Sequence, residues 1–217
     1  MVLDEMITGF RWSAHGAQHV YGVTPDLSCW GKAMGNGFAV SALAGRREVM
    51  ELGGLNTDAD RVFLLSTTHG PETTGLAAFI AVADAYTSGD PVGLMEQAGR
   101  DLASGVRAAA EAAGVSEHVT VSGRPSCLVF GTRDADGVPS QAWRTLFLQE
   151  LLRRGVLGQS FVTSAAHTAD DVAHTVSAVA EACRVYRDAL DTGSVDGFLV
   201  GRPVAPALRR SAAPRRL

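Results

Sequence analysis

Residues 30 to 37 of this chain read Trp30-Gly31-Lys32-Ala33-Met34-Gly35-Asn36-Gly37. Lys32 is the single lysine among 217 residues, and the other eighteen basic residues are arginines. A lysine amine can lose its proton and form a Schiff base with a carbonyl group, whereas a guanidinium stays charged. The lysine count alone leaves two interpretations open, a reactive amine or a surface residue left by a compositional preference for arginine. The neighbouring motifs decide between them.

A carboxylate, Asp4, precedes this lysine by 28 positions. Val2 and Leu3 predict the end of a buried strand, so Asp4 and Glu5 would lie at its carboxyl edge, where open α/β sheets bind ligands. Downstream, a proline and an aspartate predict a turn, and residues 27–33 form a short apolar stretch that carries the lysine. Pyridoxal phosphate requires such a pair, because an acid keeps its ring nitrogen protonated and an amine holds its aldehyde.

Three motifs carry a resemblance to a known family. They are Leu3-Asp4-Glu5-Met6-Ile7-Thr8-Gly9-Phe10-Arg11, Gly22-Val23-Thr24-Pro25-Asp26-Leu27 and Gly31-Lys32-Ala33-Met34-Gly35-Asn36-Gly37. In this order and spacing they resemble the cofactor-binding core of class III aminotransferases, nearest to the glutamate-1-semialdehyde 2,1-aminomutase branch. The resemblance extends over about residues 1–190. It implies an α/β fold, the C-terminal half of a fold-type I transferase that depends on pyridoxal 5'-phosphate, with part of the large-domain sheet and a small α+β C-terminal domain.

The resemblance also implies roles for individual residues. Lys32 resembles the lysine that holds the cofactor as a Schiff base, and Asp4 resembles the aspartate that pairs with the pyridine nitrogen. Met6 stands where the family has a small branched residue on one ring face, a departure that methionine tolerates because it fills irregular apolar gaps. Ile7 replaces a glutamine of many class III transaminases and favours the aminomutase branch. The alternative for Asp4 is an ordinary strand-end carboxylate that caps a helix.

A second motif, over residues 66–75, precedes an apolar run. It resembles a family stretch whose threonine reaches the cofactor phosphate of the neighbouring subunit. Matching Glu72 to the glutamate of that stretch gives this role to Thr68, with Thr67 as the next candidate. A hydroxyl group and backbone N–H groups near a helix start suit an anion. The alternative is that one of the later threonines only caps the helix.

Composition narrows the class of protein. A hydrophobic content of 46% indicates a globular chain, and a net charge of -4 argues against nucleic acid as a partner. No apolar run approaches the ~18 residues of a membrane span, and no signal-like segment opens the chain, so we expect a cytoplasmic enzyme without a membrane partner. Cys29, Cys127 and Cys183 predict reduced thiols. His15 and His19 lack a third ligand, so no metal is expected.

The order of the motifs and the change of composition along the chain predict three segments. Residues 1–90 would be the C-terminal part of the cofactor-binding large domain, 91–190 a linking helix with the C-terminal α+β domain, and 191–217 a disordered basic tail. Asp90 and Thr168 are the predicted N-caps of two helices. The expected helices cover residues 76–87, 91–113, 141–154 and 169–190, and the expected strands cover 119–121, 126–131 and 156–164.

Two function hypotheses follow. The first is an enzyme that moves an amino group of a small-molecule amine or amino acid, within one substrate as an aminomutase or between two as a transaminase, and that is a homodimer when complete. In the family a long N-terminal half, with the phosphate-binding loop, precedes the position of Asp4. The chain is therefore expected to be a C-terminal half. The alternative is a truncated, non-catalytic remnant, or one half of a split enzyme acting as an assembly subunit.

Overall fold

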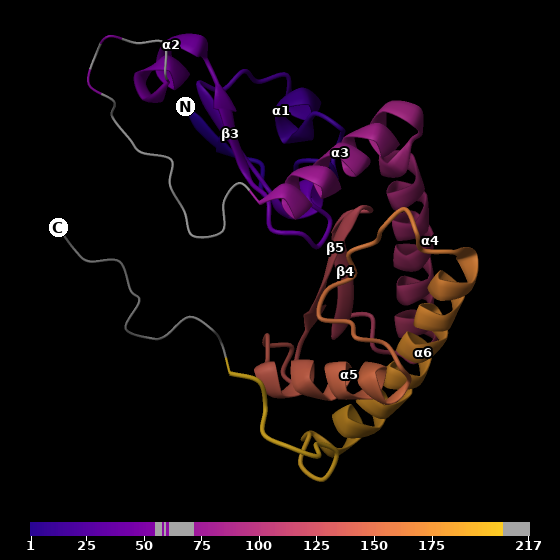
Figure 1. Ribbon diagram of the computed structural model, residues 1–217. Helices are drawn as coiled ribbons and strands as arrows, with labels where there is room; N and C mark the ends of the chain where they lie inside the picture. The colour runs from indigo at the N-terminus through magenta and orange to yellow at the C-terminus, as the bar shows by residue number, and fades with distance from the viewer. Residues whose placement is uncertain (55–57, 59, 61–71, 206–217) are drawn as a thin grey trace, which may run out of the picture. The chain divides into compact units, whose positions relative to one another are not determined.

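The computed structural model describes residues 1–54, 58, 60 and 72–205. The chain divides into two compact units, Met1–Met95 and Glu96–Leu217. We describe each unit by itself (Figure 1).

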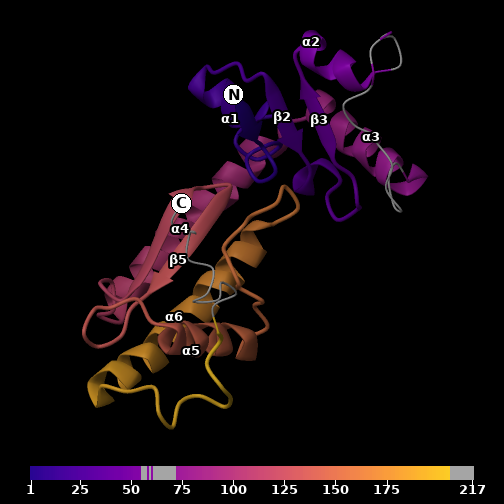
Figure 2. The ribbon, with the colours of Figure 1, turned by 90° about the vertical axis from the view of Figure 1, so that its left-hand side faces the viewer.

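The first unit is built on a three-stranded sheet. Strands β1 (Val2–Asp4), β2 (Leu27–Trp30) and β3 (Ala42–Gly45) lie in that order, with β1 parallel and β3 antiparallel to β2; Figure 2 shows β2 and β3 as neighbouring arrows. The helical elements of the unit are α1 (Gly16–Tyr21), η1 (Lys32–Met34), α2 (Arg47–Met50), η2 (Glu51–Gly53) and α3 (Thr73–Ser88).

The prediction of a buried first strand is wrong. Val2 is 65% exposed. The reason is topological, because β1 lies at the edge of the sheet and pairs with β2 alone among the described strands. A sequence pattern predicts the extended conformation, whereas burial depends on how many neighbours a strand has.

The alanine-rich run after residue 75 is helical as predicted, but it is not buried. In α3 only Gly75 is buried, and Ile80 is 60% exposed. Alanine and leucine lose little conformational entropy when they become helical. The helix can therefore form without other elements packed over its surface. The apolar composition of α3 therefore predicted its conformation correctly and its surroundings wrongly.

The second unit packs helices against one hairpin. Its hairpin consists of β4 (Val119–Arg124) and β5 (Cys127–Thr132), which pair antiparallel. Three helices contribute to its core: α4 (Pro91–Ala112), most of which belongs to this unit, α5 (Gln141–Arg153) and α6 (Ala169–Thr192) (Figure 1). The core includes Phe130, Phe147, Tyr186 and the side chains of β4 that face the helices.

Both predicted N-caps are confirmed. The Asp90 carboxylate accepts a hydrogen bond of 2.9 Å from the Gly93 N–H in the first turn of α4. Thr168 accepts from the Asp171 N–H at 3.2 Å while Asp171 accepts from the Thr168 N–H at 2.8 Å, which is a capping box. These local hydrogen bonds need no tertiary partner, so the sequence predicts them well.

The strand predicted at 156–164 is wrong. The segment makes a single bridge, with the Phe161 N–H donating to the Leu128 carbonyl at 3.1 Å. Phe161 and Thr163 are buried, whereas Leu157 is 86% exposed. The segment is held by side chains that enter the core rather than by a backbone ladder, which its alternating apolar residues alone could not reveal.

The segment expected to begin the disordered tail packs on α5. Val195 is buried, and Phe198 packs against the core. The Gln149 amide donates to the Phe198 carbonyl at 2.9 Å and accepts from the Val200 N–H at 2.8 Å. Residues 193–205 thus make contacts that their composition does not predict. Residues 206–217 lie outside the described part of the chain.

Candidate functional site

The carboxyl ends of β1 and β2 meet at one edge of the sheet. The two strands are parallel, with Asp4 opposite Cys29 in the register. Lys32 follows three residues after Cys29 in the same direction. Because both strands run the same way, the predicted acid and the predicted amine lie at the same sheet edge, the place where α/β sheets bind ligands.

Asp4 is the last residue of β1 and is exposed. One carboxylate oxygen, Oδ1, accepts the Met6 N–H at 2.8 Å, which turns the chain out of the strand. The next residue continues the pairing, because the Glu5 N–H donates to the Cys29 carbonyl at 2.9 Å. Asp4 is thus held in place by the backbone on both sides, and its second carboxylate oxygen has no hydrogen-bond partner among the described residues.

Lys32 begins the 3-10 turn η1 in a strained conformation. Its φ angle is +46°, in the left-handed region that L-residues seldom adopt. Its side chain is exposed, and its amine forms no ion pair or hydrogen bond with the described residues. Strain at a non-glycine residue of this kind is found at functional sites, where the surroundings hold a side chain in one direction.

Met6 lies against the lysine loop, which is the segment of residues 31–37 that carries Lys32. A Cβ atom added to Gly31 would come within 2.5 Å of Met6 Cε and 2.8 Å of Met6 Sδ. The thioether therefore covers the backbone directly before Lys32, and a larger residue at position 31 would require the Met6 side chain to move. The structure brings three of the four predicted site residues, Asp4, Met6 and Lys32, to this edge, and the fourth, Thr68, lies outside the described residues, as does Thr67.

Glu5 has a structural role that the sequence analysis did not recognise. Its side chain is fully buried and accepts hydrogen bonds from the Ala17 and Gln18 N–H groups, each at 2.8 Å, and from the Thr8 hydroxyl group. A negative charge at the first amides of α1 is favourable, because these N–H groups have no partner within the helix. Gly16 has a φ angle of +72°, and any other residue there would place a Cβ atom where the Glu5 carboxylate lies. An acid after a strand and a glycine at a helix start are the weak signals of this contact.

An aromatic cluster joins the segment after β1 to α3. The Phe10 ring makes edge contacts with Trp30, Phe79 and Tyr86, at centroid distances of 5.9, 6.2 and 5.4 Å. The Tyr86 hydroxyl donates to the Phe10 carbonyl, and burial raises the pKa of Tyr86. Trp30 directly precedes Gly31, so this cluster supports the lysine loop from the side of α3.

The first turn of α3 also approaches this loop. A Cβ on Gly75 would meet the Ala39 carbonyl oxygen at 2.5 Å, so helix and loop backbones are in close contact there.

His15 and His19 have ring centroids 5.6 Å apart, and the described residues contain no group of three ligands that could hold a metal ion. In the described part of the chain, no helix is long and apolar enough to cross a membrane.

The side chains at this edge fit pyridoxal phosphate. An exposed amine without a partner can take the aldehyde, a carboxylate with a free oxygen can hold the ring nitrogen proton, and a thioether offers an apolar surface. Each of the three comes from a short segment whose backbone is fixed by the sheet or by a glycine contact. The donor set is therefore the one that this cofactor needs.

Comparison with known proteins gives a family match and similar relatives. Residues 1–182 match the family described as aminotransferase class-III. The chain is 34% identical over 184 residues to a 3-aminobutyryl-CoA aminotransferase of Cloacimonas acidaminovorans, covering 83% of this chain and 42% of that protein. It is 35% identical over 194 residues to a glutamate-1-semialdehyde 2,1-aminomutase of Desulforudis audaxviator, covering 85% and 44%. The chain thus spans less than half the length of these relatives.

Solved structures agree with the predicted fold. The FumI protein of Sphingopyxis sp. MTA144, with pyridoxal phosphate, is similar with a TM-score of 0.75 and 25% identity, covering 89% of this chain and 44% of that one. An omega-transaminase of Sphaerobacter thermophilus is similar with a TM-score of 0.73 and 26% identity, covering 86% and 44%. The prediction of an α/β chain equivalent to part of a fold-type I transferase is confirmed.

Proposed function

This chain belongs to the class III aminotransferase family, whose members depend on pyridoxal phosphate, and we propose that it supplies the lysine and the ring-binding carboxylate of an enzyme that moves an amino group. The observation that carries the proposal is the parallel register of β1 and β2, which directs Asp4 and Lys32 to one sheet edge. Two residues 28 positions apart in sequence need such a register to act on one ring.

Each residue would have a defined task. Pyridoxal phosphate, when bound, supplies an electron sink for a carbanion next to nitrogen. Asp4 Oδ2 would hold the proton on the pyridine nitrogen, and its other oxygen is fixed by the Met6 N–H. Lys32 Nζ would hold the aldehyde carbon and, once released by the incoming amine, would take a proton from one carbon and return it to another. Met6 would cover one ring face and exclude water from it.

The finer activity is proposed from the resemblance to aminomutases. Ile7 and the match to aminomutases favour an exchange of amino and carbonyl positions within one small substrate, and a transaminase with a separate amino acceptor is the closest alternative. Adding an amine alone distinguishes the two, because a transaminase stops after one amino transfer without an acceptor. We propose a cytoplasmic homodimer, with Thr68 as the phosphate contact of the neighbouring subunit's cofactor.

Trapping of the cofactor tests the role of Lys32. The chain is incubated with pyridoxal phosphate, reduced with borohydride and digested, and the labelled peptide is identified by mass spectrometry. The label is expected on Lys32, and Lys32→Arg should lose it, because arginine keeps the charge but forms no imine. As the chain has no other lysine, label on the N-terminal amine without label on Lys32 contradicts the proposal.

A second candidate function is an assembly subunit that acts only with another polypeptide, or a remnant that has lost catalysis. Val2 on the edge strand and Ile80 on α3 are large apolar side chains more than half exposed, which favours a covered surface in the working protein. The experiment is co-expression with the N-terminal half of a relative. If turnover of an amino donor is the same with and without that half, the assembly candidate is wrong.

A further inference from the structure

Strand β4 has an unpaired edge. It pairs with β5, and no other strand of the described chain pairs with it. The Arg133 N–H donates to the His118 carbonyl at 2.9 Å, so the alternation of an antiparallel ladder turns the backbone groups of Val119 and Val121 to the other edge. The Val119 N–H is taken by the Val115 carbonyl at 2.8 Å. The Val119 carbonyl and both backbone groups of Val121 have no partner among the described residues.

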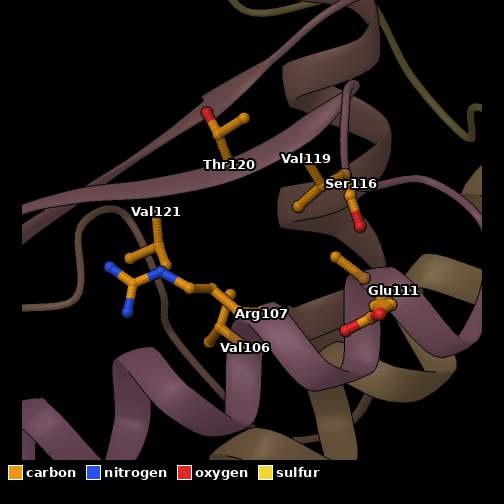
Figure 3. A pocket seen from close by; sticks show the side chains of 8 residues that line it. Val106, Arg107, Glu111, Ser116, Val119, Thr120 and Val121 are labelled. Carbon is orange, nitrogen blue, oxygen red and sulfur yellow. The ribbon is translucent and has the colours of Figure 1, made fainter.

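A groove of about 330 Å³ lies between this edge and α4. Figure 3 shows that Val119 and Val121 point toward α4, whereas Thr120 points away. Val106 and Ala110 of α4 form the opposite, buried wall. These four apolar residues are at most 8% exposed, so residues i and i+2 of an added strand would both lie over the mouth of the groove, between its exposed polar side chains.

Two opposite charges border the groove and remain unpaired. Arg107 and Glu111 are one turn apart on α4 and exposed, yet they form no ion pair with each other or with another described residue. On the same helix Glu96 and Arg100, at the same spacing, do pair, at 3.3 Å. In the pair of Glu96 and Arg100 the acid precedes the base. In the pair of Arg107 and Glu111 the base precedes the acid, which is the weaker orientation on a helix. Both charges are therefore available to a ligand.

We propose that this groove binds an extended peptide segment of another polypeptide, which adds a strand antiparallel to β4. Its backbone would satisfy the Val119 carbonyl and both backbone groups of Val121, and two alternate apolar side chains would cover the mouth of the groove. Arg107 lies alongside Val121 and Glu111 lies nearer Ser116, before the start of β4 (Figure 3). A segment that runs opposite to β4 meets Arg107 first, so it carries an acidic residue before the apolar pair and a basic residue after it.

A peptide fits better than a small apolar molecule, because only a peptide backbone supplies alternating donors and acceptors to a strand edge. The groove belongs wholly to the second unit, so the inference is independent of the cofactor and of the proposed amino transfer.

The test uses the whole chain and a fluorescein-labelled synthetic peptide of seven residues. The peptide has aspartate first, lysine last, leucine at its third and fifth positions and threonine elsewhere. Fluorescence anisotropy is expected to show saturable binding, and a peptide with aspartate and lysine exchanged should bind about fivefold more weakly. Arg107→Glu should remove this preference. Arg184→Glu on α6 changes the net charge equally, away from the groove, and should leave binding unchanged.

A third peptide, methylated on the backbone nitrogen that faces the Val119 carbonyl, separates strand addition from adhesion of leucine side chains, and it should bind at least tenfold more weakly. The proposal is overturned if the methylated or the charge-exchanged peptide binds as well as the first, or if none binds up to about 2 mM. It is also overturned if sedimentation shows a dimer that Arg107→Glu dissociates, because the occupant is then a second copy of the chain.

Discussion

The two units of the chain differ in what holds them together. The core cluster of buried apolar residues lies entirely between residues 102 and 195, in the second unit, whereas the buried apolar side chains described in the first unit are those of Ala17, Pro25, Met34 and Met95. The first unit relies instead on a short sheet, an aromatic cluster and a buried carboxylate. Cofactor chemistry and stability should therefore respond to different substitutions.

The largest expected effect is on the core of the second unit. Phe147 is fully buried and contacts Phe130 at a ring distance of 5.1 Å. Phe147→Ala should destabilise that unit by about 3–5 kcal/mol, because it removes apolar contacts and leaves a cavity. Hydrogen exchange at the amides of α5 and α6 in increasing urea measures the loss, because the tryptophans of the chain lie in both units and their fluorescence does not separate them. If the same change abolishes hydrogen-exchange protection of β1 and β2, the two units are not independent in stability.

The next effect is on chemistry alone. Asp4→Asn keeps the size of the side chain and removes the charge that would hold the ring proton. The rate at which an amino donor converts the cofactor should fall about a hundredfold, which corresponds to ~2.7 kcal/mol of barrier. Trapping at Lys32 and the urea midpoint should stay unchanged. Asp84→Asn, on the exposed part of α3, is the matched control, and a normal rate in Asp4→Asn would show that Asp4 is structural.

A smaller effect should appear both in the stability of the first unit and in its reaction with the cofactor. Glu5→Gln replaces a carboxylate that accepts from Ala17 and Gln18 with an amide that also carries donors, at a cost of about 2 kcal/mol. Hydrogen exchange at the amides of α1 should become about tenfold faster or more, and trapping at Lys32 should weaken because the turn after β1 loses its anchor. Glu48→Gln, on an exposed side chain, should change neither.

The smallest effect is a pH dependence of the second unit. Burial would raise the pKa of Glu150, but hydrogen bonds from Arg154 and Gln149 and the charges of Arg153 and Arg154 outweigh it and hold that pKa below its usual range. A carboxyl group with a depressed pKa stabilises the folded state above its unfolded pKa of 4.5, and this stability is lost as the pH falls through the folded value.

The free energy of unfolding should therefore drop as the pH falls below about 4.5, and the loss from this group should be about 1 kcal/mol or less, as is usual for ion pairs that stay partly solvated. Comparison of Glu150→Gln with the unchanged chain measures it, since the variant should lose that part of the pH dependence and keep the rest. An identical pH profile for both proteins would show that the ion pairs of Glu150 contribute nothing.

Local patterns were predicted well from the sequence. Helices α4 and α6 begin at the predicted caps, because Asp90 and Thr168 bond to amides three residues away. Lys32 and Asp4 were recognised through motifs of residues close in sequence, and the structure places both at one sheet edge. Their roles toward the cofactor remain predictions.

Features that depend on distant neighbours were not predicted. The exposure of Val2 and Ile80 depends on which elements cover them, and the segment 156–164 is held by side chains in the core instead of a ladder. Glu5 stood beside Asp4 as a second carboxylate, and only the position of α1 shows that its charge is buried against two amides.

By itself the sequence determined the helix caps, the apolar helices, the family and the chemical types at the candidate site. These depend on side-chain chemistry and on contacts within a few residues. The sequence also predicted Asp4 and Lys32 as a pair, and the tertiary structure supplied the strand register that brings them to one edge. The tertiary structure alone decided that Glu5 is an internal anchor and that β4 has an unpaired edge, among the described strands, beside a groove. Strand order, register and burial are relations between segments far apart in the chain, so no local pattern encodes them.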